Sequence, residues 1–350
     1  MHDGALSSLR GEIESARKFL RVNEASRAIS TMGRITLEPS LLESAASDLT
    51  SIQLARSAWR VHDHCAAVNR AYAVFERFVE AVLGDWIAER SKKSKYTQLP
   101  EQIRNSYSTG LADILRSLSH ARYTHLSEGD LISGFNDALS GKSDYRLYPE
   151  CLTFHRNNFR WSELADVFTR CGIDKLADWV THSGRLKEFF ETSDRLAELT
   201  ESKLGELIGY RNDAAHGAVE VNEILGLDAL EEIFDFIEAF ATDLMDLVRD
   251  RWVEWLISVD DAKDVGIISE KFSSNVRIAI CEGVSLKVGQ RVIVRKPRFC
   301  RVVAIEELQV EGSDLPSVAV SRSQELGIKF SHAVPLQCKI VIPEKSTGFS

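Results

Sequence analysis

The sequence predicts a multidomain α+β protein, in which an N-terminal all-α helical bundle is followed by a small C-terminal β-barrel. In the first part of the chain apolar residues recur at helical spacing, most clearly after Leu230. From Val265 onward, short Val- and Ile-rich segments are separated by glycine-containing turns, which is the pattern of antiparallel strands. We therefore expect a helical lead-in over residues 1–45, a helical domain over 46–258 and a barrel over 259–345.

Composition describes an ordinary soluble protein. The 350 residues suit two or three domains. No apolar run reaches the ~18 residues of a membrane span and the first residues lack a signal-peptide core, so we expect a cytoplasmic protein without membrane contact. The six cysteines show no C-x-x-C spacing, which argues against a zinc site or a disulfide framework.

Charge is distributed unevenly along the chain. The net charge is −9, but residues 259–350 carry +2 (13 Lys and Arg against 11 Asp and Glu) and the remainder carries −11. The protein therefore has no general attraction to nucleic acid, and an RNA site on the acidic part would have to be local.

The first two helical stretches are mainly packing elements. Residues 1–45 place Leu9 and Phe19 on one apolar face, and residues 47–91 form the first strong helical block. Glu76 lies within the apolar stripe of that block. It is either a rim carboxylate that pairs with a neighbouring arginine or a supporting residue of a functional site.

Residues 101–140 predict two helices, whereas residues 145–161 break the helical period with a polar and aromatic loop or short extended piece. Arginine, asparagine and histidine interleaved with aromatic residues suit phosphate contact and base stacking. His155, Arg156 and Asn158 are therefore candidate substrate contacts. The alternative is a polar loop whose asparagines cap the next helix.

The stretch Tyr210–Gly217 contains the groups that metal-free RNA cleavage needs. It follows a predicted helix or helix pair over residues 185–209. The imidazole of His216 can transfer protons near pH 7. The guanidinium of Arg211 stays charged and grips phosphate, and Asn212 adds a hydrogen-bonding carboxamide.

The spacing of these groups limits how they can act. Five residues along an ideal helix separate side chains by about 140° and about 7.5 Å, so one straight helix does not aim Arg211 and His216 at one phosphate. Either the helix starts or distorts inside the stretch, or two copies complete the site. Asp213 could orient a base. The stretch also fits a plain helix C-terminus that Gly217 caps. The following helix, residues 221–257, closes the core, and we expect its acidic face to be solvated.

The predicted barrel carries the densest basic cluster of the chain, in which Arg295, Lys296 and Arg298 lie near Arg301. Such a cluster can hold a nucleic-acid backbone. The alternative is a barrel that serves dimerisation or regulation.

The string Arg211–Gly217 in its helical surroundings resembles the signature of the HEPN (higher eukaryote and prokaryote nucleotide-binding) superfamily of small helical ribonucleases. The resemblance implies RNA cleavage without a metal ion or cofactor, which leaves a 2′,3′-cyclic phosphate. It implies a homodimer with one composite cleft, and Glu76 as a partner for Arg211. It also implies a toxin or anti-phage effector with an antitoxin or activator protein. In similar bacterial proteins an Asn-bearing insert precedes a short helix, here residues 161–173.

Residues 264–342 resemble the second-domain barrel of translation elongation and initiation factors, on the segment VGIISEKF, the LKVG turn and the step IEELQVEG. This resemblance implies docking to RNA or to the ribosome and makes tRNA or ribosomal RNA the candidate substrate. No P-loop accompanies it, so no GTPase is implied. The alternative for the whole chain is a non-catalytic RNA-binding or ribosome-associated adaptor of the same fold.

Overall fold

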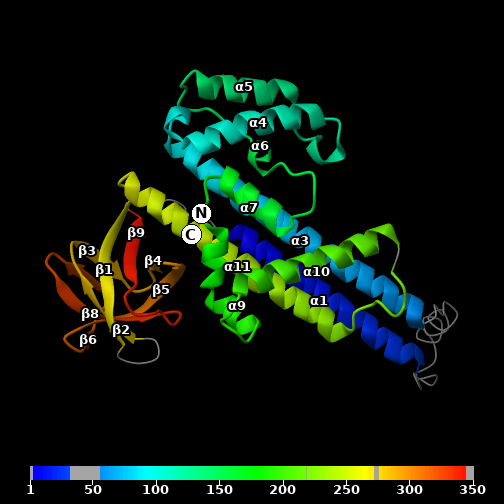
Figure 1. The fold of residues 1–350 in the computed structure, drawn as a ribbon. Coiled ribbons are helices and arrows are strands. Elements are labelled where there is room, and N and C mark those ends of the chain that lie inside the picture. Colours follow the sequence, from blue (N-terminus) through cyan, green and yellow to red (C-terminus); the bar gives the residue numbers. More distant parts are fainter. Residues whose placement is uncertain (1–2, 32–55, 218, 272–275, 344–350) are drawn as a thin grey trace, which may run out of the picture.

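The computed structural model confirms an α+β chain with helices first and an antiparallel sheet after them (Figure 1). It describes residues 3–31, 56–217, 219–271 and 276–343. The parts of the predicted lead-in, helical domain and barrel that fall on residues 1–2, 32–55, 218, 272–275 and 344–345 lie outside the described residues. Among the helices that are described, none is both long and apolar enough to cross a membrane.

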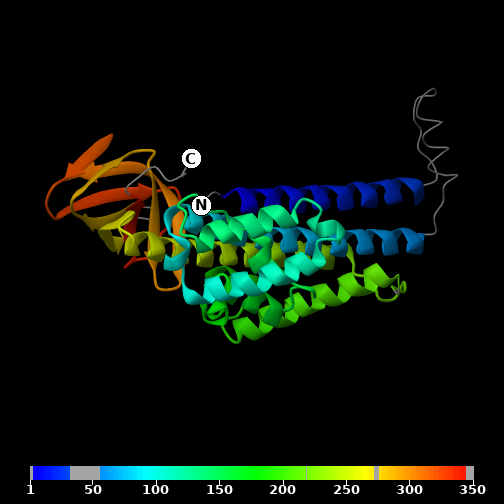
Figure 2. The same cartoon turned by 90° about the horizontal axis from the view of Figure 1, so that it is seen from above.

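Long helices that run side by side form the body of the helical domain (Figure 1, Figure 2). They are α1 (Gly4–Thr31), α3 (Arg56–Lys93), α10 (Leu196–His216) and α11 (Leu227–Ser258). The central helix α3 contacts the other three. The rings of Phe75 and Phe240 stack between α3 and α11 with centroids 5.6 Å apart, and burial of one such side chain stabilises the fold by about 1.5–3 kcal/mol.

The lead-in helix α1 buries only part of the face that its sequence suggests. Leu9, Ile13 and Leu20 are buried, but Phe19 is 58% exposed. Adjacent residues lie about 100° apart around a helix, so the face that turns Leu20 inward turns Phe19 toward solvent.

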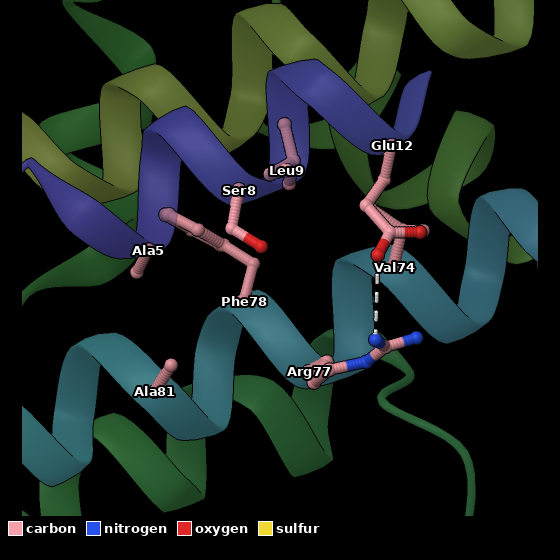
Figure 3. A pocket seen from close by; sticks show the side chains of 8 residues that line it. All are labelled: Ala5, Ser8, Leu9, Glu12, Val74, Arg77, Phe78 and Ala81. Carbon is pink, nitrogen blue, oxygen red and sulfur yellow. Dashed lines mark ion pairs between the residues drawn. The ribbon is translucent and has the colours of Figure 1, made fainter. Parts of the chain in front are cut away.

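A small cavity of about 60 Å³ remains between α1 and α3 (Figure 3). Small residues line part of it, among them Ala5, Ser8 and Ala81. Glu12 and Arg77 meet beside it with their charged atoms 3.6 Å apart. The space would hold about two water molecules, so it is a packing gap rather than a ligand site.

Shorter helices surround this body and carry the insert (Figure 1). They are η1 (Tyr96–Gln98), α4 (Glu101–Ser117), η2 (Ala121–Tyr123), α5 (Glu128–Leu139), α6 (Glu150–Thr153), α7 (Trp161–Arg170), α8 (Leu176–Thr181) and α9 (Gly184–Phe189). Of these, α4, α5 and α6 lie on one side of α3, whereas α8 and α9 pack on α10 and α11. Within residues 145–161, predicted to be irregular, α6 is an additional helical turn. It packs so closely on α4 that a Cβ at Gly110 would lie 1.6 Å from the carbonyl oxygen of Cys151.

The C-terminal domain is an antiparallel sheet that curls on itself (Figure 1). The strands of this main sheet are β1 (Ala262–Lys271), β2 (Val276–Cys281), β4 (Arg291–Lys296), β5 (Phe299–Val310), β6 (Ser313–Asp314), β8 (Gln324–Phe330) and β9 (Lys339–Pro343). Two further strands, β3 (Val284–Lys287) and β7 (Ser317–Val320), pair with each other in a separate two-stranded sheet. The hydrogen-bonded order is β4-β9-β1-β2-β8-β5-β6, and β4 also pairs with β5. The ladder therefore closes, as in a small barrel. Along β8, Leu326, Ile328 and Phe330 alternate inward, which is the period that the sequence predicted.

The helix α11 joins the two domains. Ile293 and Val341 of the sheet belong to the same apolar core as the helices. The expectation of a solvated acidic face on α11 holds for its first half, where Glu232 and Asp235 are exposed. It is wrong for the second half, because Asp243, Asp246 and Asp250 are buried. Around residues 240–250 of α11, the helices α1 and α9 and the sheet pack against it. Together they leave no side of this part of α11 exposed to solvent.

Candidate active site

The motif occupies the last turns of α10, which continues without interruption through His216. Gly217 follows with φ +68°, and its N–H donates to the carbonyl oxygen of Asp213, which is a left-handed cap of the kind that favours glycine. Arg211 is half-buried, whereas Asp213 and His216 are exposed. The helix neither starts nor distorts inside the motif, so Arg211 and His216 of one chain face different directions.

Arg211 lies against α3 through the ring of Tyr72. The guanidinium carbon is 5.5 Å from the ring centroid, within the range of a cation–π contact, and Nη1 donates to Oδ1 of Asn212 at 3.2 Å. The hydroxyl of Tyr72 accepts a hydrogen bond from the Phe159 backbone N–H at 2.8 Å. Burial, and then the charge of Glu76, raise the pKa of Tyr72 well above its ordinary value. The ring is therefore a neutral, fixed surface beneath the cation.

The insert before α7 meets the motif through Asn158. Its Nδ2 donates to Oδ1 of Asn212 at 2.8 Å, so one carboxamide oxygen accepts from both Arg211 and Asn158. This orientation turns the amide N–H groups of Asn212, which are donors, to the other side. By contrast, Arg156 is exposed and pairs with Asp113 on α4 at 3.3 Å.

Glu76 follows Tyr72 by one turn of α3 and pairs with groups other than the expected one. Its carboxylate lies 3.4 Å from Nη1 of Arg122 and 3.3 Å from Nε2 of His155. Burial alone would raise the pKa of Glu76, but hydrogen bonds and charges from His155 and Arg122 outweigh burial and lower it. Among the described ion pairs Glu76 has none with Arg211, whose guanidinium lies beside the Tyr72 ring.

His155 is buried rather than exposed to a substrate. Its ring lies 4.0 Å from the ring of Phe159, and its Nε2 lies 3.3 Å from both Glu76 and Glu80. The ligand atoms of Glu76, Glu80 and His155 lie within 4.8 Å of one another, so this set could hold a metal ion. The guanidinium of Arg122 pairs with both carboxylates and supplies positive charge there. The expectation of a metal-free reaction stays a prediction.

The charge of Asp213 affects the pKa of His64, a histidine of α3 outside the motif. Burial lowers the pKa of His64, and the negative charge of Asp213 offsets part of that effect. Nδ1 of His64 accepts from the Leu225 backbone N–H at 3.2 Å, and its ring meets the edge of Tyr210 at 5.8 Å. His64 thereby ties α3 to the segment that follows the motif.

The residues that sequence reasoning missed are Tyr72, Glu80 and Arg122. Tyr72 has the same spacing as the core aromatics around it, so nothing local sets it apart. Glu80 lies four residues after Glu76 and therefore on the same helix face, which was a usable signal. Arg122 comes from the short η2 turn and carries no signal in its surroundings.

The predicted basic cluster lies where the sheet meets α11, at the end of the helical domain away from the motif (Figure 1). Arg295 pairs with Asp250 at 2.9 Å, and Nε and Nη2 of Arg298 donate to Asp178 at 3.0 and 2.7 Å. Lys296 lies between these arginines and is half-buried. Asp250 follows the start of α11 by 23 residues, or about 35 Å, so the fold does not bring this cluster to the motif.

The sequence of the chain matches the model of a known protein family. A family model described as RiboL-PSP-HEPN matches residues 40–250, which is more than half of the chain. The match includes α3, α10 and the motif and ends before the sheet begins. No curated protein matches the chain.

Proposed function

This chain belongs to the RiboL-PSP-HEPN family, and from that membership and the surroundings of its motif we propose that it is a metal-independent endoribonuclease. His216 acts as the general base or acid, Arg211 stabilises charge on the phosphate, and Asn212 hydrogen-bonds to it. The observation that carries the proposal is the fixed Arg211–Asn212 pair. Tyr72 lies beneath its guanidinium and Asn158 orients its carboxamide.

The proposed reaction is an internal transfer followed by strand separation. The 2′-hydroxyl of one nucleotide loses its proton and attacks the adjacent phosphorus, and the 5′-oxygen of the next nucleotide leaves with a proton. The products are a 2′,3′-cyclic phosphate and a 5′-hydroxyl end. The exposed imidazole of His216 suits these proton transfers near pH 7, and the charge of Arg211 offsets the charge that develops on the phosphorane oxygens.

Two copies of the chain are proposed to complete one cleft. Within a continuous helix Arg211 and His216 diverge by about 140°, so a single chain does not direct both at one phosphate. A two-fold axis beside the end of α10 would place the same surface on both sides. His216 of one copy could then approach Arg211 of the other. The exposed last turn of α10 suits such an interface.

The biological role follows from the resemblances alone. The likeness of residues 264–342 to the second domain of translation factors supports tRNA or ribosomal RNA as the substrate. A cytoplasmic toxin or anti-phage effector, governed by an antitoxin or an activator, is the role that HEPN relatives suggest. The cluster of Arg295, Lys296 and Arg298 takes no part in the proposed active site, because its arginines pair with carboxylates of the helical domain.

The decisive experiment is cleavage of total bacterial RNA in EDTA by purified protein, with mapping of the product ends. The wild type is expected to leave 2′,3′-cyclic phosphates. His216→Ala is expected to lose at least about 100-fold in rate, the usual contribution of a proton-transferring group. Arg211→Ala is expected to lose about as much, the usual contribution of one group that stabilises charge in the transition state. Arg116→Ala and His332→Ala, which change exposed residues elsewhere, serve as matched controls. Cleavage that persists in both motif variants would place the active site elsewhere.

A second candidate function is a non-catalytic RNA-binding adaptor. The observation in its favour is that His216 and Gly217 already make a satisfactory helix end. An adaptor would bind RNA with unchanged ends in every variant. An absence of cleavage by the wild type, together with retained RNA binding, would support it against the nuclease.

A further inference from the structure

A cavity between the two domains has the dimensions of a ligand site. Its volume is about 480 Å³, and sites of roughly 300–1,000 Å³ at domain interfaces are typical for small molecules. Its walls come from the start of α8, the second half of α11, the turn between β4 and β5, and β9. Both domains therefore contribute to it, and it lies at the end of the molecule away from the motif (Figure 1).

The cavity is strongly cationic in an acidic protein. The cationic side chains that line it are Lys175, Arg251, Arg295, Lys296, Arg298 and Lys339. The acidic ones are Asp178, Asp250 and Glu254. The lining has six cations against three anions, and Lys339 also pairs with Asp264 outside the lining, so two positive charges stay uncompensated, whereas the whole chain carries −9. Positive charge concentrated in a partly enclosed place focuses the electric field and attracts an anion.

The arginines of the cavity are fixed in place before any ligand arrives. Arg295 lies 2.9 Å from Glu254, and Arg298 lies 2.7 Å from Asp178. A guanidinium has five N–H donors, so these contacts leave donors for a phosphate. Lys175 and Arg298 also adopt φ of 66° and 63°, a left-handed conformation that is uncommon outside glycine and clusters at binding sites.

Two lysines of the cavity are not held in any described ion pair. Lys175 is exposed and Lys296 half-buried, and neither has an ion pair among the contacts of the described residues. An ammonium group is a mobile point charge that binds phosphate well. These lysines therefore supply the excess, while the arginines supply the fixed geometry.

We propose that this cavity binds a small molecule through two or three linked phosphates, the group that inorganic tripolyphosphate and nucleoside di- and triphosphates share. The excess charge matches that group in sign and approximate size. A continuous RNA backbone fits less well, because Asp178, Asp250 and Glu254 would repel successive phosphates. The lining aromatic, Trp179, is only 4% exposed, so it has no free face for the base stacking on which single-stranded RNA binding relies.

Such a ligand would act on the joint between the domains. Arg295 and Arg298 also fasten the sheet domain to α11 and α8, so phosphate binding would reinforce or replace those pairs. A ligand with different affinity for two domain arrangements shifts the population between them. The site would therefore regulate the arrangement of the two domains. It goes beyond the proposed nuclease function and does not depend on it.

The test is isothermal titration of the full chain in EDTA with ATP, ADP, adenosine, inorganic tripolyphosphate and a short RNA oligonucleotide. We expect ATP, ADP and tripolyphosphate to bind and adenosine to fail. Lys175→Ala and Lys296→Ala are each expected to weaken ATP binding about tenfold, because a phosphate–ammonium contact is lost. Arg322→Ala, which removes an exposed cation of the same domain outside the cavity, should bind ATP as the wild type does.

Three results would overturn the proposal. They are no binding of any phosphorylated probe, ATP binding that both lysine variants retain, and binding of RNA alone that the lysine variants lose. Thermal melts of each variant separate a lost site from a lost fold. Arg211→Ala should bind ATP normally, so a failure of the nuclease proposal and a failure of this one give different results.

Discussion

Arg211 owes its position to residues outside its own helix. The ring of Tyr72 lies beneath the guanidinium, and the hydroxyl of that ring is fixed by the backbone of Phe159. The same insert supplies Asn158, which holds the carboxamide of Asn212. At the scale of single residues, therefore, two groups of the motif are positioned by α3 and by one short segment before α7.

Replacing Tyr72 tests this positioning. Tyr72→Leu removes the ring and is expected to lower the rate of RNA cleavage about tenfold, because a cation–π contact contributes about 0.5–2 kcal/mol and 1.4 kcal/mol is a factor of ten. Tyr72→Phe keeps the ring and should keep most of the rate. Kinetics on one RNA oligonucleotide, well below the melting temperature of each variant, measure the effect. Equal rates for the two variants would contradict a role for the ring.

At the scale of elements, the close packing of α4 on α6 leaves no room for a side chain at Gly110. Gly110→Ala would place a Cβ 1.6 Å from the carbonyl oxygen of Cys151, so α4 and α6 must separate. We expect a loss of at least about 2 kcal/mol in the free energy of unfolding. Gly205→Ala on α10 is the matched control, because no atom lies within 4 Å of its added Cβ. That variant should gain about 0.5–1 kcal/mol. Urea unfolding distinguishes the two, and a shared sign would refute the packing argument.

The buried half of α11 holds a carboxyl group in an unfavourable place. Burial raises the pKa of Asp243 to about 7, and contacts with Ser183 and Arg185 offset only part of the shift. Its Oδ2 is buried without a hydrogen-bond partner among the described residues. In the unfolded chain an aspartate ionises near pH 4, so the folded state binds more protons between about pH 4 and 7. Its contribution to stability is therefore full below that range and is lost as the pH rises through it.

Asp243→Asn should remove this pH dependence. Relative to the wild type, the free energy of unfolding of the variant should rise by up to about 1.4 kcal/mol per pH unit between about pH 4 and 7, and level off above. Urea unfolding of both proteins across that range gives the difference directly. A difference that stays constant with pH would mean that Asp243 is ionised throughout.

At the scale of the whole molecule the two candidate sites are far apart. The motif lies at one end of the long helices and the sheet domain at the other (Figure 2). The catalytic proposal needs a second copy of the chain, because one chain directs Arg211 and His216 apart. The cavity proposal needs only the two domains of one chain.

Mixed dimers test the composite cleft. Arg211→Ala and His216→Ala subunits that carry different tags can be co-expressed and isolated as a heterodimer. If His216 of one copy works with Arg211 of the other, one of two symmetric arrangements stays intact. About half of the wild-type activity is then expected, although each parent homodimer is inactive. An inactive heterodimer, shown by size and tag content to be assembled, would argue against sharing between copies.

Local features of the chain could be predicted from the sequence because short-range physics controls them. The spacing of apolar residues distinguishes helices from strands. Gly217 in the sequence marks the end of α10, because glycine favours the left-handed cap that the helix has there. The short helix α7 after the insert was expected from the resemblance to similar bacterial proteins, and the structure has it at Trp161–Arg170. The exposed Phe19 and the buried Asp243 were mispredicted, because burial depends on which neighbours pack around a helix.

The sequence by itself determined the helical and strand-forming parts, the family signature and the chemical groups of the motif, since residue type and spacing encode all of these. Only the tertiary structure decided that Tyr72 lies under Arg211, that Asn158 orients Asn212 and that Glu76 pairs with Arg122. It also decided that Lys175 and Lys296 line the same cavity. These contacts join residues tens of positions apart, and their partners are chosen by the packing of whole helices and of the sheet, which no local pattern records.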